Sequence, residues 1–247
     1  MKEYGLIGFP LGHSFSDGYF AEKFRAEGIE GCSYSKFPIE TVDRLPQLLA
    51  EHPDLRGFNV TKPYKQQVMA FLDDLNDEAR QIGAVNCVKI DNGRLTGYNT
   101  DAYGFRISLL ELIGNRRPQA LVLGSGGASK AVEYALKNLD MEHFTVSRQA
   151  SRGRITYTDV DKRLLEAYPL IINATPLGTS PRTDEAPPLP YHFMTAENLL
   201  FDLVYNPPVT KFLTLGAARG ARGINGYQML VAQAEKSWEI WNGANDA

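Results

Sequence analysis

The sequence predicts an α/β protein of two domains, and three observations support this fold class. Short apolar runs alternate with amphipathic stretches along most of the chain, a pattern typical of α/β proteins with parallel sheets. A glycine-rich turn at residues 124–128 separates an apolar run from a helical pattern. The length of 247 residues corresponds to between one and two domains, at roughly 150 residues each.

Composition excludes several classes of protein. Hydrophobic residues make up 43 % and charged residues 22 %, as in ordinary globular domains. No run approaches ~18 consecutive apolar residues, and an acid at position 3 argues against a signal peptide. The net charge of −3 predicts no nucleic-acid surface. Two cysteines and four scattered histidines predict a reducing, cytoplasmic compartment and no metal site.

Strand and helix patterns alternate up to about residue 100. The predicted strands are Tyr4–Gly8, Cys32–Phe37, Leu55–Val60, Val85–Ile90 and Arg94–Tyr98. The predicted helical segments are Ser16–Glu27, Thr41–Glu51, Tyr64–Leu72 and Asp77–Ile82. Ser16 is the expected N-cap of the first helix. Asn92-Gly93, between the last two strands, indicates a hairpin.

A second series of strand and helix patterns begins near residues 98–105, where we expect the two domains to join. A helix over Asp101–Ile113 leads through a charged break to a buried strand, Gln119–Leu123, and a helix beginning near Ala128. The segments that continue this series are Phe144–Val146, Lys162–Ala167, Leu170–Ala174, Leu199–Val204, Thr210–Ala218 and a final helix, Tyr227–Trp241. Four prolines in Pro181–Pro190 predict an extended loop.

The glycine turn at 124–128 has the surroundings of a dinucleotide-binding site. Glycines let the backbone approach a pyrophosphate, and the N-terminus of the following helix supplies N–H donors. Enzymes that use NAD carry an acid at the end of the next strand, whereas this chain has Ser147-Arg148 and no acid until Asp159. A guanidinium binds a 2′-phosphate well, so Arg148 predicts NADP(H). The alternative is a solvated arginine loop, since Arg152 and Arg154 follow.

Four short segments in the first hundred residues carry small polar side chains at strand ends, where open α/β sheets bind ligands. They are residues 8–16 (GFPLGHSFS), 59–65 (NVTKPYK), 83–86 (GAVN) and 97–101 (GYNTD). Hydroxyls, amides, a lysine and an aspartate suit a small, polyhydroxylated, anionic substrate better than an apolar one.

Taken in order, these motifs resemble those of the NADP-dependent shikimate dehydrogenase family. The resemblance extends through residues 173–178 (NATPLG), 202–207 (DLVYNP) and 226–233 (GYQMLVAQ), and so covers nearly the whole chain. It implies reversible NADPH-dependent reduction of 3-dehydroshikimate to shikimate, on the pathway to chorismate and the aromatic amino acids, by a monomer or homodimer. It also implies a substrate domain over 1–101, completed by 223–247, and a Rossmann-type domain over 102–222, with the active site in the cleft between them.

The resemblance implies a role for each matching residue. Ser14 and Ser16 would hold the substrate carboxylate, and Lys65 with Asp101 would form the catalytic pair. The residues that would hydrogen-bond ring hydroxyls are Thr61, Asn86, Asp101 and Gln233, with Asn59 nearby. The residues that would line the cofactor are Gly124, Ser125, Gly126, Gly127, Ala128, Ser147, Arg148, Asn173, Ala174, Thr175, Pro176, Val204, Gly226 and Met229.

The chemistry of alcohol oxidation favours an acid/base pair but leaves its division of labour open. A free lysine has a pKa near ~10.4, which burial would lower and a neighbouring carboxylate would raise. Lys65 could therefore relay the proton or stabilise alkoxide charge. The competing structural interpretations are a solvated Lys65, Asp101 as the N-cap of the following helix, and a solvated Gln233. His13 is expected to be a turn residue.

The chain also departs from the family pattern. Asp17 replaces a common proline, and Tyr19-Phe20 stand where His-Asn is usual. Ser147-Arg148-Gln149 stand where Asn-Arg-Thr is usual, and the two changed contacts to the 2′-phosphate predict a weaker preference for NADP. Lys62 adds a charge whose role the sequence does not explain. The alternatives are a quinate/shikimate or aminoshikimate dehydrogenase and, from a different class, a non-catalytic dinucleotide-binding regulator.

Overall fold

The computed structural model describes residues 1–12, 15–151 and 153–243, and the chain divides into two compact units. Unit 1 comprises Met1–Thr100 with the segment from Gln233 on, and unit 2 comprises residues 101–232. The predicted boundaries differ at Asp101 and at residues 223–232, which all group with unit 2. Residues 223–232 do so because strand β12 (Arg222–Ile224) pairs with β11 (Leu199–Asp202) and Met229 packs in the core of that unit. Across the described part of the chain, no helix is both long and apolar enough to cross a membrane.

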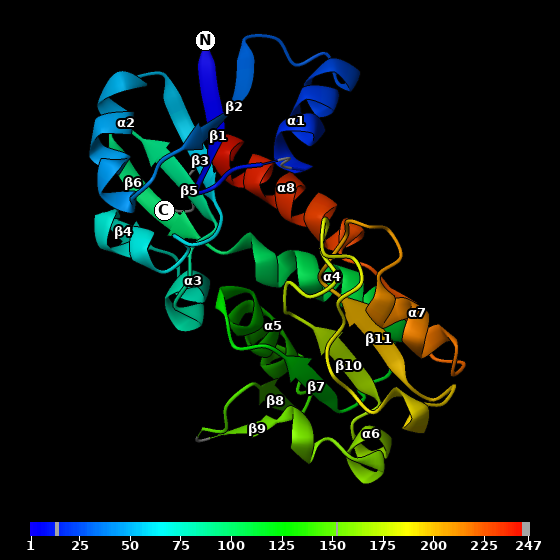
Figure 1. Ribbon diagram of the computed structural model, residues 1–247. Helices are drawn as coiled ribbons and strands as arrows, with labels where there is room; N and C mark the ends of the chain where they lie inside the picture. Colours follow the sequence, from blue (N-terminus) through cyan, green and yellow to red (C-terminus); the bar gives the residue numbers. More distant parts are fainter. Residues whose placement is uncertain (13–14, 152, 244–247) are drawn as a thin grey trace. The chain divides into compact units, whose positions relative to one another are not determined.

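Unit 1 contains a six-stranded mixed sheet in the order β2-β1-β3-β5-β6-β4 (Figure 1). Its strands are β1 (Lys2–Gly8), β2 (Cys32–Pro38), β3 (Leu55–Val60), β4 (Asp74–Leu75), β5 (Cys87–Asp91) and β6 (Arg94–Tyr98). The sheet is mixed because β5 runs antiparallel to both β3 and β6. The predicted hairpin is confirmed: Asn92 and Gly93 both have positive φ, 50° and 80°, as a type I′ turn requires.

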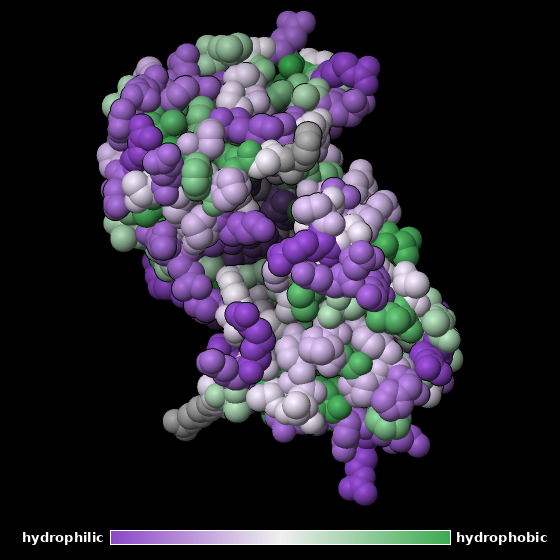
Figure 2. Space-filling model, in the orientation of Figure 1, coloured by the Kyte–Doolittle hydropathy of each residue, from purple (hydrophilic) through white to green (hydrophobic). Residues whose placement is uncertain are grey.

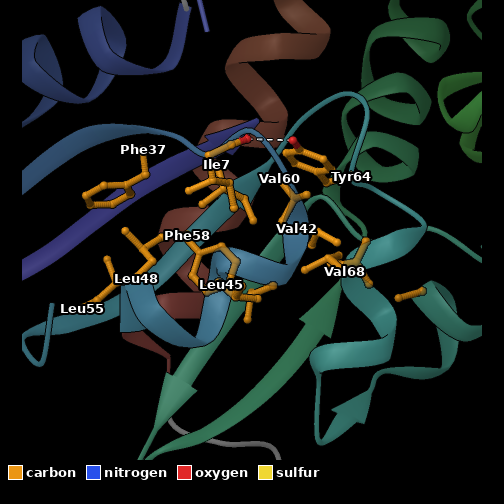
Figure 3. Close-up of a cluster of buried hydrophobic side chains, with 14 residues drawn as sticks. Ile7, Phe37, Val42, Leu45, Leu48, Leu55, Phe58, Val60, Tyr64 and Val68 are labelled. Atoms are coloured by element: carbon orange, nitrogen blue, oxygen red, sulfur yellow. Dashed lines mark hydrogen bonds between the residues drawn. The ribbon is translucent and has the colours of Figure 1, made fainter. Parts of the chain in front are cut away.

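One face of this sheet is covered by short helices. They are the 3₁₀ turns η1 (Val42–Arg44) and η2 (Gln67–Phe71) and the helices α2 (Leu45–Glu51) and α3 (Asp77–Ile82). Figure 3 shows their side chains, such as Val42 and Leu45, packed against Ile7 and Phe58 of the sheet. The Tyr64 hydroxyl donates to the carbonyl of Ile39 at 2.7 Å, so this phenol is buried with its hydrogen bond satisfied.

The opposite face is covered by α1 (Phe15–Ala26) and the end of the last helix, α8 (Tyr227–Asn242). Helix α1 begins at Phe15, so Ser16 lies in its first turn and is not the N-cap. Trp241 of α8 packs with Tyr4 and Phe20, and its indole Nε1 donates to the carbonyl of Val88 at 2.9 Å. The end of the C-terminal helix is therefore part of the core of unit 1.

Unit 2 contains six parallel strands in the order β12-β11-β10-β7-β8-β9. They are β7 (Ala120–Leu123), β8 (His143–Ser147), β9 (Arg154–Thr156), β10 (Leu170–Asn173), β11 (Leu199–Asp202) and β12 (Arg222–Ile224). Numbered within the unit, the order is 3-2-1-4-5-6, which confirms the predicted Rossmann-type domain. β9 and β12 were not predicted, because a three-residue strand carries too little periodicity to detect.

Helices cover both faces of this parallel sheet. The core residues of one face come from α4 (Thr100–Ile113), α5 (Gly127–Asn138) and the start of α8, and those of the other face come from α6 (Lys162–Ala167) and α7 (Lys211–Ala217). Two 3₁₀ turns, η3 (Tyr157–Asp159) and η4 (Tyr191–Phe193), complete the unit. Residues 181–190 form no helix or strand, in agreement with the predicted loop. On the face drawn in Figure 2, hydrophilic residues cover most of each unit and hydrophobic ones form small separate patches.

Candidate active site

Unit 1 holds a group of buried and half-buried amide and hydroxyl side chains, here called the amide network. Its members are Asn59, Asn86, Thr100, Gln233 and Ser237. Asn86 is at its centre: its Nδ2 donates to Gln233 Oε1 at 2.9 Å, and its Oδ1 accepts from the Thr100 N–H at 2.6 Å. Since Asn86 is only 2 % exposed, these bonds hold its amide in one orientation.

Asn59 joins the amide network from strand β3. Its Nδ2 donates to Ser237 Oγ at 2.9 Å, and its Oδ1 accepts from the Tyr34 hydroxyl at 2.9 Å. A hydrogen bond links Ser16 to the same phenol, and burial raises the pKa of Tyr34, which therefore stays a neutral donor. The structure thus connects four predicted substrate residues, Ser16, Asn59, Asn86 and Gln233, through hydrogen bonds.

The predicted catalytic residues lie in two other segments, Lys65 in unit 1 and Asp101 at the start of unit 2. Lys65 is half-buried in the turn after β3, where its carbonyl accepts from the Val85 N–H at 2.7 Å, one residue before Asn86. Thr61 begins that turn, and its N–H donates to the carbonyl of Ile7 at 3.0 Å. Asp101 is 6 % exposed and lies in the first turn of α4, because the helix begins at Thr100; the N-cap interpretation is therefore wrong. Ser14 and His13 lie outside the described residues.

The glycine turn of unit 2 lies where the strand order of the Rossmann sheet reverses. Gly124 follows β7 with φ of +109°, a conformation that favours glycine. A Cβ at this position would lie 3.1 Å from Thr175 Cγ2 and 3.2 Å from the Ala174 carbonyl oxygen, in the turn after β10. The predicted cofactor segments 124–128 and 173–176 therefore contact each other at the switch point, which is the usual dinucleotide site in this fold.

The N-terminus of α5 fits a phosphate group. Gly126 is the N-cap and has no side chain to bond the first N–H groups of the helix, and Ser125 and Gly126 are exposed. Gly127 and Ala128 form the first turn, while the Ser129 hydroxyl turns back and donates to the Gly126 carbonyl at 2.8 Å. Open N–H donors at a helix N-terminus are the feature that binds a pyrophosphate.

Arg148 stands exposed immediately after β8. Ser147 is buried, and its hydroxyl donates to the carbonyl of Gln149 at 2.5 Å, which holds the turn that carries Arg148. Burial raises the pKa of Tyr157, and the positive charge of Arg148 opposes that rise, so the two side chains are electrostatic neighbours. Arg154 is exposed in β9, and Arg152 lies outside the described residues. An exposed guanidinium beside a tyrosine suits a phosphate ester.

A second buried network, here called the carboxylate network, joins the ends of β10 and β11. It consists of the side chains of Asn173, Asp202 and Thr210, all completely buried. Asp202 accepts from Asn173 Nδ2 at 2.9 Å and from Thr210 Oγ1 at 2.5 Å. It also accepts from the Val204 N–H at 3.0 Å, which ties the carboxylate to a predicted cofactor residue.

Comparison with known proteins shows similarity along nearly the whole chain. Residues 6–88 match the model of the shikimate dehydrogenase substrate binding domain. The NADP(+) shikimate dehydrogenase of Clostridium beijerinckii is 39 % identical, with 98 % of this chain and 92 % of that protein covered. The Carboxydothermus hydrogenoformans protein of the same name is 37 % identical, with 98 % and 91 % covered. The solved Thermus thermophilus shikimate 5-dehydrogenase, in complex with NADP(H) and shikimate, is 33 % identical with a TM-score of 0.87, with 99 % and 94 % covered.

The chain belongs to the shikimate dehydrogenase family. Its membership confirms the family resemblance of the motifs, which lie in both units of the molecule.

Reasoning from the family motifs missed four members of the two networks, Thr100, Ser237, Asp202 and Thr210, and also Tyr34, which donates to Asn59. Ser237 follows Gln233 by four positions on α8, so helical spacing could have placed both on one face. Thr100 and Asp202 stand inside family motifs but had no assigned role. Tyr34 has no signal in the sequence, because it reaches Asn59 only through the pairing of β2, β1 and β3.

Proposed function

We propose that this protein catalyses the reversible reduction of 3-dehydroshikimate to shikimate with NADPH, in the cytoplasm, as a step toward chorismate and the aromatic amino acids. The observation that carries the proposal is the near-complete coverage of relatives named NADP(+) shikimate dehydrogenase, across both units. We further propose that the protein acts as a monomer or homodimer on a small-molecule substrate.

The substrate is held by unit 1 in this proposal. Ser14 and Ser16 bind the carboxylate, while Thr61, Asn86, Asp101 and Gln233 bind ring hydroxyls. The amide network supports these roles because it fixes the orientation of Asn86 and Gln233 before substrate arrives, which reduces the cost of ordering them. Asn59 lies nearby, and its proposed part is to hold Ser237 and the backbone of Asn86 in place through its own hydrogen bonds.

Proton transfer is assigned to Lys65 and Asp101. Bound NADP(H) supplies or receives the hydride, and the protein must move one proton to or from the substrate oxygen. A positioned acid/base of this kind contributes about 10²–10⁴-fold to the rate. The turn that holds the Lys65 carbonyl against Val85, next to Asn86, supports a fixed place for this lysine close to the hydroxyl-binding amide.

The cofactor is held by unit 2. The turn formed by Gly124, Ser125, Gly126, Gly127 and Ala128 binds the pyrophosphate, and Ser147 with Arg148 binds the adenine-side phosphate. The residues on the nicotinamide side are Asn173, Ala174, Thr175, Pro176, Val204, Gly226 and Met229. A Cβ on Gly226 would lie 2.3 Å from the carbonyl oxygen of Leu203, so only glycine allows this segment to pass beside Val204.

Initial rates with shikimate test the proposal. They are measured from the absorbance of the reduced nicotinamide. We expect kcat/KM for NADP to exceed that for NAD by at least about tenfold, the effect of one charge-assisted contact to the 2′-phosphate. Arg148→Ala should remove that preference by weakening NADP alone, and Arg154→Ala is the matched control. Equal use of both cofactors by the native protein would contradict the role of Arg148. Faster turnover of quinate than of shikimate would contradict the proposed substrate, and no turnover of either would favour a regulator.

A further inference from the structure

We propose that Asp202 is a positioning residue that sets the geometry of both loops on the nicotinamide side of the cofactor site. The inference rests on the proposed function for the identity of the ligand. Asp202 ends strand β11 and is completely buried, and it receives hydrogen bonds from a preceding loop, from its own loop and from the start of α7.

The first loop depends on Asp202 through Asn173. Asn173 Nδ2 donates to Asp202 Oδ1 at 2.9 Å, which leaves Asn173 Oδ1 facing the other way. That oxygen accepts from the Thr175 N–H at 3.1 Å and from the Thr175 hydroxyl at 2.6 Å. Thr175 in turn contacts the Gly124 position of the glycine turn. The carboxylate therefore fixes the amide orientation that shapes the 173–176 turn.

The second loop depends on Asp202 at both ends. The Val204 N–H donates to Oδ1 at 3.0 Å, and the Val204 carbonyl accepts from the Gly226 N–H at 3.2 Å. At the far end, the Thr210 hydroxyl donates to Oδ2 at 2.5 Å and also accepts from the Leu213 N–H at 3.3 Å, as the N-cap of α7. One carboxylate thus holds residues 203–210 at their first and last turns.

Asp202 supplies the charge of the carboxylate network, since its three hydrogen-bond donors are neutral. A carboxylate accepts at both oxygens and donates nowhere, so it requires every neighbour to present a hydrogen. An amide in its place would keep only one acceptor oxygen and no charge, so the bond to Thr210 would have to reverse, with the amide N–H donating to the hydroxyl. Burial raises the pKa of Asp202 to about 6, so the side chain is largely ionised at neutral pH.

Variants at Thr210 separate positioning from simple stability. Thr210→Val keeps the shape of the side chain and removes both hydroxyl bonds, whereas Thr210→Ser keeps the hydroxyl. Asp161→Ala is the matched control, because Asp161 caps α6 in the same unit by accepting from Leu164 N–H at 2.9 Å and takes no part in either loop. Each variant is first examined by thermal unfolding without ligand.

The dissociation constant for NADPH is measured from the fluorescence of the cofactor. KM is measured for shikimate and for the cofactor. We expect Thr210→Val and Asp202→Asn to weaken NADPH binding about tenfold, the effect of one charge-assisted hydrogen bond. The KM for shikimate should stay within about twofold, and Thr210→Ser and Asp161→Ala should bind NADPH normally. Unchanged NADPH affinity in folded Thr210→Val, or equal losses in Asp161→Ala, would overturn the inference. A native protein that binds NADPH without turning over shikimate would instead overturn the proposed function and leave this inference standing.

Discussion

The amide network and the carboxylate network both hold polar side chains in fixed positions, but they differ in charge and in hydrogen-bonding chemistry. Each lies where strands end and side chains must be held still, and each joins segments far apart in the sequence. The amide network of unit 1 is neutral, and its members both donate and accept, so they form hydrogen bonds with one another. The carboxylate network of unit 2 is centred on Asp202, which only accepts hydrogen bonds. Its donors therefore come from the segments around it.

The difference has two consequences. A neutral network keeps its hydrogen bonds over a wide pH range, whereas a buried carboxylate changes its charge near its own pKa. Conversely, a carboxylate gathers several backbone and side-chain donors at one point, which suits loops that must shape a cofactor site. The predictions below test each side of this comparison, beginning with the chemistry that the amide network supports.

The largest effect is expected at Lys65. Lys65→Ala should lower kcat by about 10²–10⁴-fold, because it removes a positioned acid/base. KM should change only a few-fold, since the proposed contacts of the amide network to the ring hydroxyls do not involve Lys65. Steady-state kinetics measure this, with the exposed neighbour Lys62→Ala as control. A near-normal kcat in Lys65→Ala would contradict the proposed acid/base role of Lys65.

The next effect is the pH dependence of stability that only the carboxylate network should show. Burial raises the pKa of Asp202 to about 6, against ~3.9 in an unfolded chain. The folded protein therefore binds this proton more tightly than the unfolded chain, and its stability falls as pH rises from about 4 through 6. The loss is about 3 kcal/mol.

The comparison of native protein with Asp202→Asn isolates this titration. Urea unfolding between pH 4 and 7 should show the free energy of unfolding of the native protein falling by about 3 kcal/mol relative to the variant. Tyr191 and Tyr157 lie in this environment, but burial raises the pKa of both, so they stay neutral over this range. A difference that is constant with pH would refute the charged state of the network.

The smallest effect is expected when the amide network is broken. Asn86→Ala should lower the free energy of unfolding by about 2–3 kcal/mol, because it leaves the buried Thr100 N–H and the half-buried side-chain carbonyl of Gln233 without their partner. It should also raise KM for shikimate and leave NADPH affinity unchanged. Asn76→Ala is the matched control: it removes the N-cap of α3 in the same unit, at a cost of about 1 kcal/mol, and should leave KM unchanged. A normal KM for shikimate in Asn86→Ala would contradict the proposed role of the amide network in substrate binding.

Local sequence signals were sufficient for most elements. The bounds of β3, β6 and α3 agree with the predicted ones, because each is bracketed by turn or cap residues. The Asn92-Gly93 hairpin was predictable from two residues, since their positive φ values are a local property. The very short strands β9 and β12 were not, because their conformation comes from pairing with β8 and β11.

The sequence by itself determined the α/β class, the Rossmann-type unit and the family, because these depend on periodicity and on motifs carried by neighbouring residues. It also supplied most candidate site residues, which stand at strand ends within those motifs. Only the tertiary structure decided what each buried polar group bonds to. Asn86 and Gln233 are 147 positions apart, Asn59 and Ser237 are 178 apart, and Asn173 and Asp202 are 29 apart. A hydrogen bond forms at about 3 Å between groups whatever their separation in sequence, so no local pattern specifies such a partner.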